Sequence, residues 1–522
     1  MRALRRMAQG SAVVNEIDTD MRSILDVAGD LGLREVAQPW GPGRAKIPQA
    51  GDVAQRGRLV LVSGMSPTPA GEGKTTMAIG LADGLRRLGH AAVPVLRQPS
   101  QGPVFGKKGG GTGGGRATLE PSVPINLHLT GDFHAVAAAH NLLAAMVDNA
   151  AHRGQLPPGS VPTWRRVVDV NDRALRRVTV GLDGTPRASA FDITAASEVM
   201  AVLALARDFD DLQSRLGRMM VATGGVTAAS IGAVGAMAAL LHEAWWPNLV
   251  QTQEGGPALV HAGPFANIAH GTCSRAAMRL ALAHADYALV EAGFGFDLGG
   301  EKFLDIVCRD APELWPSAMV LVVTERAVAM HGVANLARHL DNARRFGVPT
   351  VVVVNSHPGD PPRSALDEAC AARDVPLARC DAFARGGEGA IEAARAVVSL
   401  PASAGPRALY TLDAPLVDKL EAVAATYGAA GVDLSPGALD ALGPVGPWPV
   451  CMAKTPLSFT HDPKQAGAPS GFRLPVRELR ASHGAGFVVA LCGEITTMPA
   501  LPAVPAALRV RVGPDGAVSG VG

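Results

Sequence analysis

The chain has 522 residues, with 48 basic against 47 acidic side chains and a formal charge of +1. This balance excludes a protein that holds nucleic acid through bulk positive charge. Apolar residues make up 48% of the chain, which fits a globular protein with a large buried core and not a disordered one. At this length we expect about three domains.

Membrane and secreted classes are also disfavoured. No apolar run approaches the ~18 residues that a spanning helix needs, so we expect no membrane partner. The basic residues 1–10 are followed by no apolar core and do not resemble a secretory signal. The six cysteines are scattered without a CxxC pair, which disfavours metal clusters and disulfide frameworks. We therefore expect a reducing, cytoplasmic location.

The first predicted elements are a helix and then a strand–loop–helix–strand unit. Hydrophobic periodicity predicts a helix within residues 20–31, a buried strand at 58–63, a helix at 75–88 and a second strand at 91–96. A strand, a Gly-rich loop, a helix and another strand form a βαβ unit. This unit implies a parallel sheet flanked by helices, the architecture of an α/β fold.

Later segments continue the α/β pattern. Apolar runs bounded by turns predict strands at 287–292, 319–323 and 350–355, and helical periodicity marks 335–346 and 387–400.

The end of the chain has a different character. Proline-rich stretches at 358–362 and 401–406 are candidate boundaries. A smaller mixed region follows, in which we predict strands at 450–454, 476–480 and 486–494.

Residues 106–115 (GKKGGGTGGG) could be a linker by composition. Linkers, however, usually lie between domains, and this run lies between a βαβ unit and another helical segment. Because glycine lets the backbone approach a ligand closely, we favour a ligand-binding loop.

The strongest motif is PTPAGEGKTT at 67–76, between the predicted strand and helix. Backbone N–H groups and the positive helix N-terminus at such a turn bind phosphates. Lys74 would reach the outer phosphates, and the Thr75 hydroxyl would ligate Mg²⁺. Thr68 replaces the first glycine of the usual P-loop spacing. ATP or GTP binding is therefore predicted, with contacts from Thr68, Pro69, Ala70, Gly71, Glu72, Gly73, Lys74, Thr75 and Thr76.

Other candidate residues carry weaker signals. Arg97 directly follows the second predicted strand, where it can hold a phosphate or carboxylate or be an ordinary surface arginine. Asp132 begins a helical stretch and can cap it or take part in catalysis. His128 and His270 have no spacing specific for zinc, and a lone histidine is more often structural. Asn355 ends a predicted strand where some P-loop proteins read the base.

Together, these segments resemble the formate–tetrahydrofolate ligase (formyltetrahydrofolate synthetase) family, of which the chain looks like a divergent member. The similar blocks follow one another in order from residue 14 to the end. They include TPAGEGKTT (68–76), INLHLTGDFHA (125–135), PNLVQTQEGGPALVHAGPFANIAHG (247–271), EAGFGFDLGGEKFLDIVCR (291–309), VCMAKTPLS (450–458) and GAGFVVALCGEITTMPALP (484–502).

The resemblance implies a two-step reaction. ATP phosphorylates formate to formyl phosphate, and the N10 amine of tetrahydrofolate then attacks the formyl carbon and displaces phosphate. By the same resemblance, Arg97 holds formyl phosphate while His128, Asp132 and His270 lie near the reacting groups. Phosphoryl transfer needs positioned cations, which Lys74, Arg97 and Mg²⁺ can supply.

The resemblance also implies an organisation. The fold would be a P-loop NTPase-like parallel-sheet domain (1–305) that binds nucleotide and formyl phosphate. A second α/β domain (306–405) would contribute to the folate site, and a small mixed domain (406–522) would follow. Family members are homotetramers, and the partners implied are formate and tetrahydrofolate.

Several positions depart from the family pattern. Gln98 replaces a glutamate that the family links to monovalent-cation effects, which leaves that dependence open. The Gly-rich block is altered at Lys107, Gly111, Thr112 and Arg116, and the segment after Gly332 is shorter than usual. The family stacks the pterin between a phenylalanine and a tryptophan; the corresponding residues here are His357 and Phe383.

These departures keep alternatives open beside the ordinary ligase reaction. One alternative is a paralogue that activates formate with ATP and formylates a different acceptor. A second is a non-catalytic nucleotide-binding paralogue. The last is an unrelated P-loop kinase or GTPase.

Overall fold

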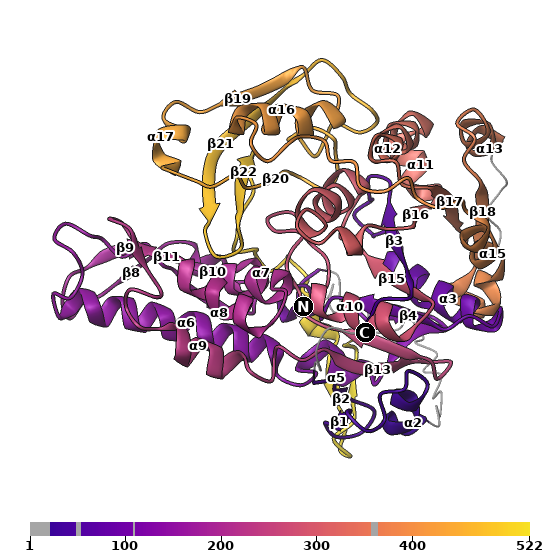
Figure 1. The fold of residues 1–522 in the computed structure, drawn as a ribbon, viewed down its shortest axis with the longest axis horizontal. Helices are drawn as coiled ribbons and strands as arrows, with labels where there is room; N and C mark the ends of the chain where they lie inside the picture. Colours follow the sequence, from indigo (N-terminus) through magenta and orange to yellow (C-terminus); the bar gives the residue numbers. More distant parts are fainter. Residues whose placement is uncertain (1–20, 49–53, 108–109, 357–363, 522) are drawn as a thin grey trace, which may run out of the picture.

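The structure is a computed structural model that describes residues 21–48, 54–107, 110–356 and 364–521. A large twisted sheet forms its centre (Figure 1). In spatial order its strands are β1 (Gln38–Pro39), β2 (Ala45–Lys46), β13 (Asn248–Thr252), β14 (Pro257–Val260), β4 (Ala92–Leu96), β15 (Tyr287–Glu291), β3 (Arg58–Gly64), β16 (Ala318–Val323), β17 (Thr350–Asn355) and β18 (Leu377–Cys380), with β5 (Gly113–Gly114) and β6 (Ala117–Glu120) attached beside β13.

Most of this sheet is parallel. The strands from β14 to β18 pair in parallel, whereas β1, β2, β6 and β13 add an antiparallel edge. β3 lies between β15 and β16. The loop after β3 therefore opens near the middle of the carboxyl edge, where ligands bind in open α/β sheets.

Helices cover both faces of the sheet, so its central strands are largely apolar. Alternate residues of β3 point to opposite cores: Leu59 and Leu61 belong to one, Val60 and Val62 to the other. The second core is formed with α3 (Lys74–Arg87) and α15 (Ile391–Ser399). The first is formed with helices that include α10 (Arg275–His284) and α12 (Val333–Phe346).

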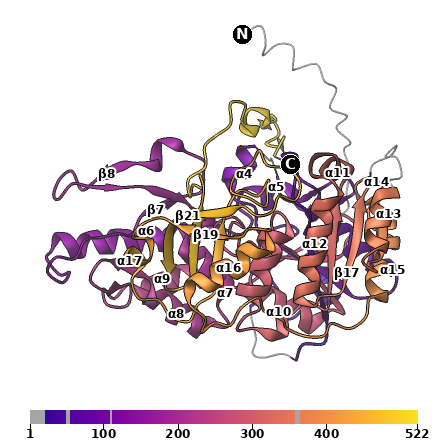
Figure 2. The same ribbon diagram turned by 90° about the horizontal axis from the view of Figure 1, so that it is seen from above.

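Two further bodies pack on this core. A helical lobe extends to one side in Figure 1 and contains α6 (Asp132–His152), α7 (Glu198–Leu205), α8 (Phe209–Arg218) and α9 (Val234–Leu241). The C-terminal sheet has the order β19 (Gly431–Leu434), β21 (Arg473–Ser482), β22 (Phe487–Cys492), β20 (Val450–Ala453), with α16 (Leu416–Thr426) packed on it. Figure 2 shows this sheet beside the lobe and α12. Among the described residues, no helix has both the length and the apolar character needed to cross a bilayer.

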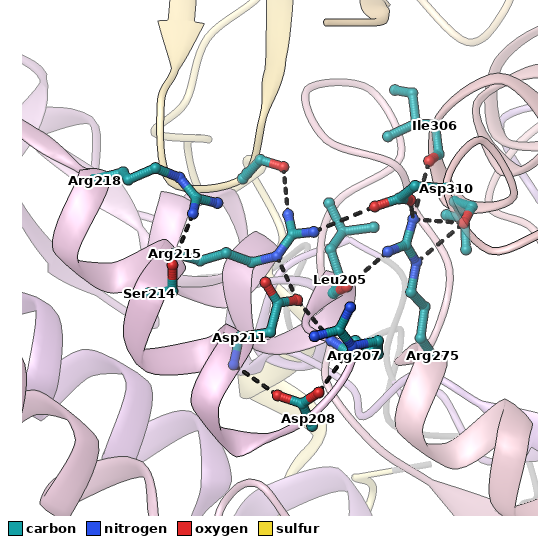
Figure 3. A network of polar contacts seen from close by, with 12 residues as sticks. Leu205, Arg207, Asp208, Asp211, Ser214, Arg215, Arg218, Arg275, Ile306 and Asp310 are labelled. Carbon is teal, nitrogen blue, oxygen red and sulfur yellow. Dashed lines mark hydrogen bonds and ion pairs between the residues drawn. The ribbon is translucent and has the colours of Figure 1, made fainter. Parts of the chain in front are cut away.

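An arginine network joins the lobe to the C-terminal sheet (Figure 3). Arg215 of α8 binds Asp211 at 2.9 Å and also donates to the carbonyl of Ala485, in the turn between β21 and β22. Buried Arg275 of α10 binds Asp310 and the carbonyl oxygen of Val307. The network therefore connects three parts of the chain that lie far apart in the sequence.

The predicted elements agree well with the observed ones. The strands predicted at 58–63, 91–96, 287–292, 319–323 and 350–355 are β3, β4, β15, β16 and β17, and the three C-terminal strands are β20, β21 and β22. The helix predicted at 20–31 is the shorter α2 (Ile24–Gly29) within the described residues. The α/β class is confirmed, but the antiparallel edge of the sheet was not predicted. Strands β16–β18, within 306–405, pair in the same sheet as β3.

Candidate active site

Residues 65–73, the predicted phosphate loop, connect β3 to α3 and border a cavity of about 560 Å³. Lys74 is the first residue of α3, and it lines the cavity with Thr68, Pro69, Gly71 and Thr75. The first N–H groups of a helix have no partner within it, so they and the positive helix end can bind an anion here.

Glu72 fixes the conformation of this loop through hydrogen bonds. Its buried carboxylate accepts the Thr68 N–H at 2.6 Å and the Thr324 hydroxyl, which follows β16. Its own carbonyl accepts the Asn355 side-chain amide at 3.1 Å. Gly73 has φ of +71°, and a Cβ there would lie 2.5 Å from Asn355 Nδ2. Asn355 therefore contacts the loop backbone; its predicted contact with the base stays a prediction.

A carboxylate and a hydroxyl meet beside Lys74. Thr75 Oγ1 donates to Glu291 Oε2 at 2.7 Å. Glu291 ends β15 and pairs in register with Val62 of the neighbouring β3, so the sheet brings it to the loop. These hard oxygen donors fit a divalent cation such as Mg²⁺. Glu291 was not predicted as a site residue, although its place near the end of a predicted strand was an available signal.

The charges around the cavity favour an anionic ligand. Among the residues that the structure describes, its charged lining consists of Lys74, Arg97, Lys107 and Glu291. Burial, with a smaller contribution from Arg97, lowers the pKa of Lys74, and Glu291 and Glu72 oppose that shift. A phosphate beside Lys74 would also oppose it, since a nearby negative charge favours the ammonium form.

Arg97 occupies the predicted position at the end of β4. Its Nη1 donates to the carbonyl of Pro264 at 3.0 Å, and the side chain lines the cavity. A Cβ at Gly293 would lie 2.9 Å from Arg97 Nη2, so the small residue leaves room for the guanidinium. Arg97, which follows β4, and Lys74, which begins α3, thus border one cavity.

His270 is fully buried close to several cations. Burial, followed by the charges of Arg275, Arg97 and Lys302, lowers its pKa to about 3. The imidazole is therefore neutral at physiological pH. Neither ring nitrogen has a hydrogen-bond partner within the described part of the chain, and the residue does not line the cavity.

His128 and Asp132 are not among the residues that line the cavity. Asp132 begins α6, is buried, and forms an ion pair with Lys46 Nζ at 2.6 Å. It also accepts a hydrogen bond from the Asn248 side chain at 2.7 Å. His128 is exposed at the end of the short α5 (Ser122–Leu127), with Nδ1 3.4 Å from Gln101 Nε2. The contacts of Asp132 are those of a buried structural pair; the catalytic roles of both residues stay predictions.

The Gly-rich loop contacts both the cavity and Phe383. Gly110 and Gly111 line the cavity. Phe383, 49% exposed in α14 (Ala382–Arg385), accepts the Arg116 N–H at its carbonyl at 2.8 Å. Gly115 has φ of +62°, and a Cβ there would lie 2.0 Å from the Phe383 carbonyl oxygen. His357, the other predicted pterin contact, lies outside the described residues.

Other parts of the cavity wall come from distant segments that were not predicted to line a site. Phe265 and Phe294 supply aromatic surface, and Pro456, Leu457 and Pro499 come from the C-terminal region. Phe294 follows β15 with φ of +61°, a conformation that costs a non-glycine residue energy and is found mainly at functional sites. The outlier supports a functional role for this turn.

Comparison with known proteins identifies the family. The sequence profile described as formate–tetrahydrofolate ligase matches residues 12–522. The formate–tetrahydrofolate ligase of Myxococcus xanthus (strain DK1622) is 51% identical, covering 96% of this chain and 99% of that protein. The enzyme of the same name from Paracoccus denitrificans (strain Pd 1222) is 50% identical over 95% of this chain and 97% of its own. The chain therefore belongs to the formate–tetrahydrofolate ligase family.

Proposed function

We propose that the chain joins formate to tetrahydrofolate at the expense of ATP, and that the cavity beside the phosphate loop holds the phosphoryl chemistry. The observation that carries this assignment is the meeting of Lys74, Arg97 and the Thr75–Glu291 pair at one edge of the sheet. Family membership supports the overall reaction.

The loop would hold the ATP phosphates. Backbone N–H groups at the start of α3 bind the phosphate oxygens, and Lys74 neutralises their charge. Thr75 and Glu291 would hold Mg²⁺, which offsets negative charge on the transferring group. Glu72 keeps the loop in shape before ATP arrives, because both of its carboxylate oxygens are already bonded.

The reaction then takes two steps. A formate oxygen attacks the γ-phosphorus, the bond to the ADP oxygen breaks, and formyl phosphate forms beside Arg97. The N10 amine of tetrahydrofolate attacks the formyl carbon, phosphate leaves, and the amine loses its proton. Because formyl phosphate is hydrolysable, water must be kept out of the cavity, and the apolar side chains of Phe294 and Leu457 would exclude it.

The pterin would stack on Phe383, which contacts the same Gly-rich loop that lines the cavity. Phe383 offers an exposed aromatic face, although a smaller one than a tryptophan would. His357 is the proposed second contact. A different formyl acceptor is the alternative that this reduced stacking surface favours.

The wider setting is also part of the proposal. By resemblance to the family, the working form is a cytoplasmic homotetramer in which the three sequence regions 1–305, 306–405 and 406–522 act as domains. Sedimentation velocity measures the oligomeric state directly.

An ADP-release assay with ATP and Mg²⁺ tests the reaction. It is run with formate, with tetrahydrofolate, and with both, beside a Lys74→Met variant. Turnover that requires both substrates, yields 10-formyltetrahydrofolate and disappears in the variant is expected. Formate-dependent ADP release indifferent to tetrahydrofolate would indicate another acceptor. Absence of turnover in protein that binds nucleotide would favour the non-catalytic alternative.

A further inference from the structure

One wall of the cavity belongs to the C-terminal sheet. Pro456 and Leu457 lie in the loop after β20 and face the cavity that the phosphate loop borders. In the sequence, Leu457 lies more than 350 residues after Lys74, which directly follows the phosphate loop. Its position must therefore be set by contacts between the C-terminal sheet and the body of the protein.

Lys454 ties that loop together. Its Nζ donates to the carbonyl of Ser458 at 2.5 Å and to that of Thr455 at 3.3 Å. It also donates to Asp297 Oδ2 at 2.6 Å, and both side chains of this ion pair are 0% exposed. The ammonium lies 4.8 Å from the centre of the Tyr427 ring. One side chain thus holds both ends of the Pro456–Leu457 turn and binds it to the body.

Asp297 does not line the cavity itself but lies behind another part of its wall. It lies in η4 (Phe296–Gly300), three residues after the cavity residue Phe294. The segment is tightly packed. A Cβ at Gly295 would lie 2.5 Å from Asp297 Oδ1, and one at Gly299 would lie 2.1 Å from the Gly293 carbonyl oxygen. A shift of Asp297 would therefore move the turn that carries Phe294.

A second lysine of the same kind supports this reading. Lys302 is fully buried outside the cavity and donates to the carbonyl of Ala266 at 2.7 Å. Ala266 lines the cavity. Two buried ammonium groups thus hold cavity walls through backbone carbonyls, while Lys74 and Arg97 face the cavity itself.

We propose that the Lys454–Asp297 ion pair is a positioning pair, which fixes the distance between the Leu457 and Phe294 walls of the cavity. Buried ion pairs are often no more stabilising than apolar residues of equal volume, so stability alone does not explain this one. An ion pair with directed hydrogen bonds instead sets the register of two segments. The inference rests on the proposed use of the cavity for ligation.

A double variant tests the proposal. Asp297→Asn with Lys454→Met leaves no unpaired buried charge, and it removes the bonds to Thr455 and Ser458. We expect kcat to fall about 10- to 100-fold, because small displacements of positioning groups have effects of that size. KM for ATP should stay within about twofold of wild type, since Glu72 and β3 hold the phosphate loop independently.

Glu198→Gln is the matched control. Glu198 Oε1 accepts the Gly484 N–H at 2.6 Å and so attaches the same C-terminal sheet to α7, away from the cavity lining. We expect its kcat to stay within about twofold of wild type. A folded double variant with kcat within about twofold of wild type would overturn the proposal, as would an equal loss in Glu198→Gln.

A second variant and a second readout keep the outcome decisive. Leu457→Ala removes part of the cavity wall and leaves the ion pair unchanged. If the double variant does not fold, an unchanged kcat in Leu457→Ala overturns the proposal. Hydrogen exchange of residues 455–458 should accelerate in the double variant and not in Glu198→Gln. That readout requires no turnover, so it separates failure of this inference from failure of the proposed function in the wild-type ADP-release assay.

Discussion

Glu291 is the residue whose role depends most on the fold. In the sequence it lies next to the last position of the strand predicted at 287–292, one of several apolar strands, with nothing beside it to suggest a ligand. In the structure, the pairing of β15 with β3 sets it 2.7 Å from the Thr75 hydroxyl. The hydroxyl predicted to bind Mg²⁺ therefore has a carboxylate partner from 216 positions further along the chain.

Glu291→Gln should raise the Mg²⁺ concentration needed for half-maximal activity by about tenfold or more, because a neutral amide oxygen is a poorer ligand for a hard dication. Titration of Mg²⁺ at saturating ATP measures the effect. Thr75→Ser keeps a hydroxyl and serves as the control. An unchanged Mg²⁺ requirement in Glu291→Gln would place the cation elsewhere.

Gly115→Ala tests the contact between the Gly-rich loop and Phe383. The new Cβ would lie 2.0 Å from the Phe383 carbonyl oxygen and would force α14 to shift. We expect KM for tetrahydrofolate to rise about fivefold or more while KM for ATP is unchanged. Gly89→Ala is the control, since Gly89 has φ of +89° but open space around its Cβ position. Equal effects in the two variants would show that backbone strain alone is responsible.

At the scale of elements, α7 and the β21–β22 turn meet at a titratable group. Burial raises the pKa of Glu198 from its ordinary value of 4.5 to about 7, and the N–H groups of Gly484 and Ala485 oppose the shift. The folded protein therefore holds this proton more tightly than the unfolded chain does. Its contribution to stability is complete below pH 4.5 and is lost as pH rises through 7.

Glu198→Gln should accordingly flatten the dependence of stability on pH. Wild type is expected to lose on the order of 1 kcal/mol per pH unit from this group between pH 5 and 7, and the variant should not. Denaturant unfolding at several pH values gives the comparison. Parallel curves for the two proteins would contradict the assignment.

Prediction from sequence succeeded where the signal was local. The strand at 58–63 and the helix at 75–88 appear as β3 and α3 because each has its own apolar pattern. A glycine-containing turn between them marks where one ends and the other begins. The two-residue strands β1 and β2 have no such pattern; they form because β2 pairs with β13 and β1 pairs with β2. Leu457 could not be assigned to the cavity, since only the packing of the C-terminal sheet brings it there.

At the scale of the whole molecule, one apolar core crosses the expected domain boundaries. Its members include Leu61 of the large sheet, Leu143 of the lobe, and Ala453 and Phe487 of the C-terminal sheet. A second core, on the other face of the large sheet, also contains Val353 from the region beyond residue 305. The bodies therefore share buried surface on both sides of the proposed boundaries.

This sharing predicts a single cooperative unfolding transition. Of the six tryptophans, only Trp448 follows residue 406, so the difference between wild type and Trp448→Phe reports on the C-terminal region. We expect its fluorescence change to coincide in temperature with the loss of far-ultraviolet circular dichroism. An earlier transition for Trp448 would mean that the C-terminal sheet unfolds alone.

Because the central strands are parallel, the candidate site residues gather at the carboxyl edge of the sheet, and the opposite edge carries the turns that lead into the strands. Lys74, Arg97, Glu291 and Thr324 all follow or end strands at the carboxyl edge. The turns at the opposite edge, such as the one at Gly347 between α12 and β17, connect helices back to the strand starts. A fluorophore or surface tether attached near Gly347 would thus lie at the edge of the sheet opposite the proposed active site.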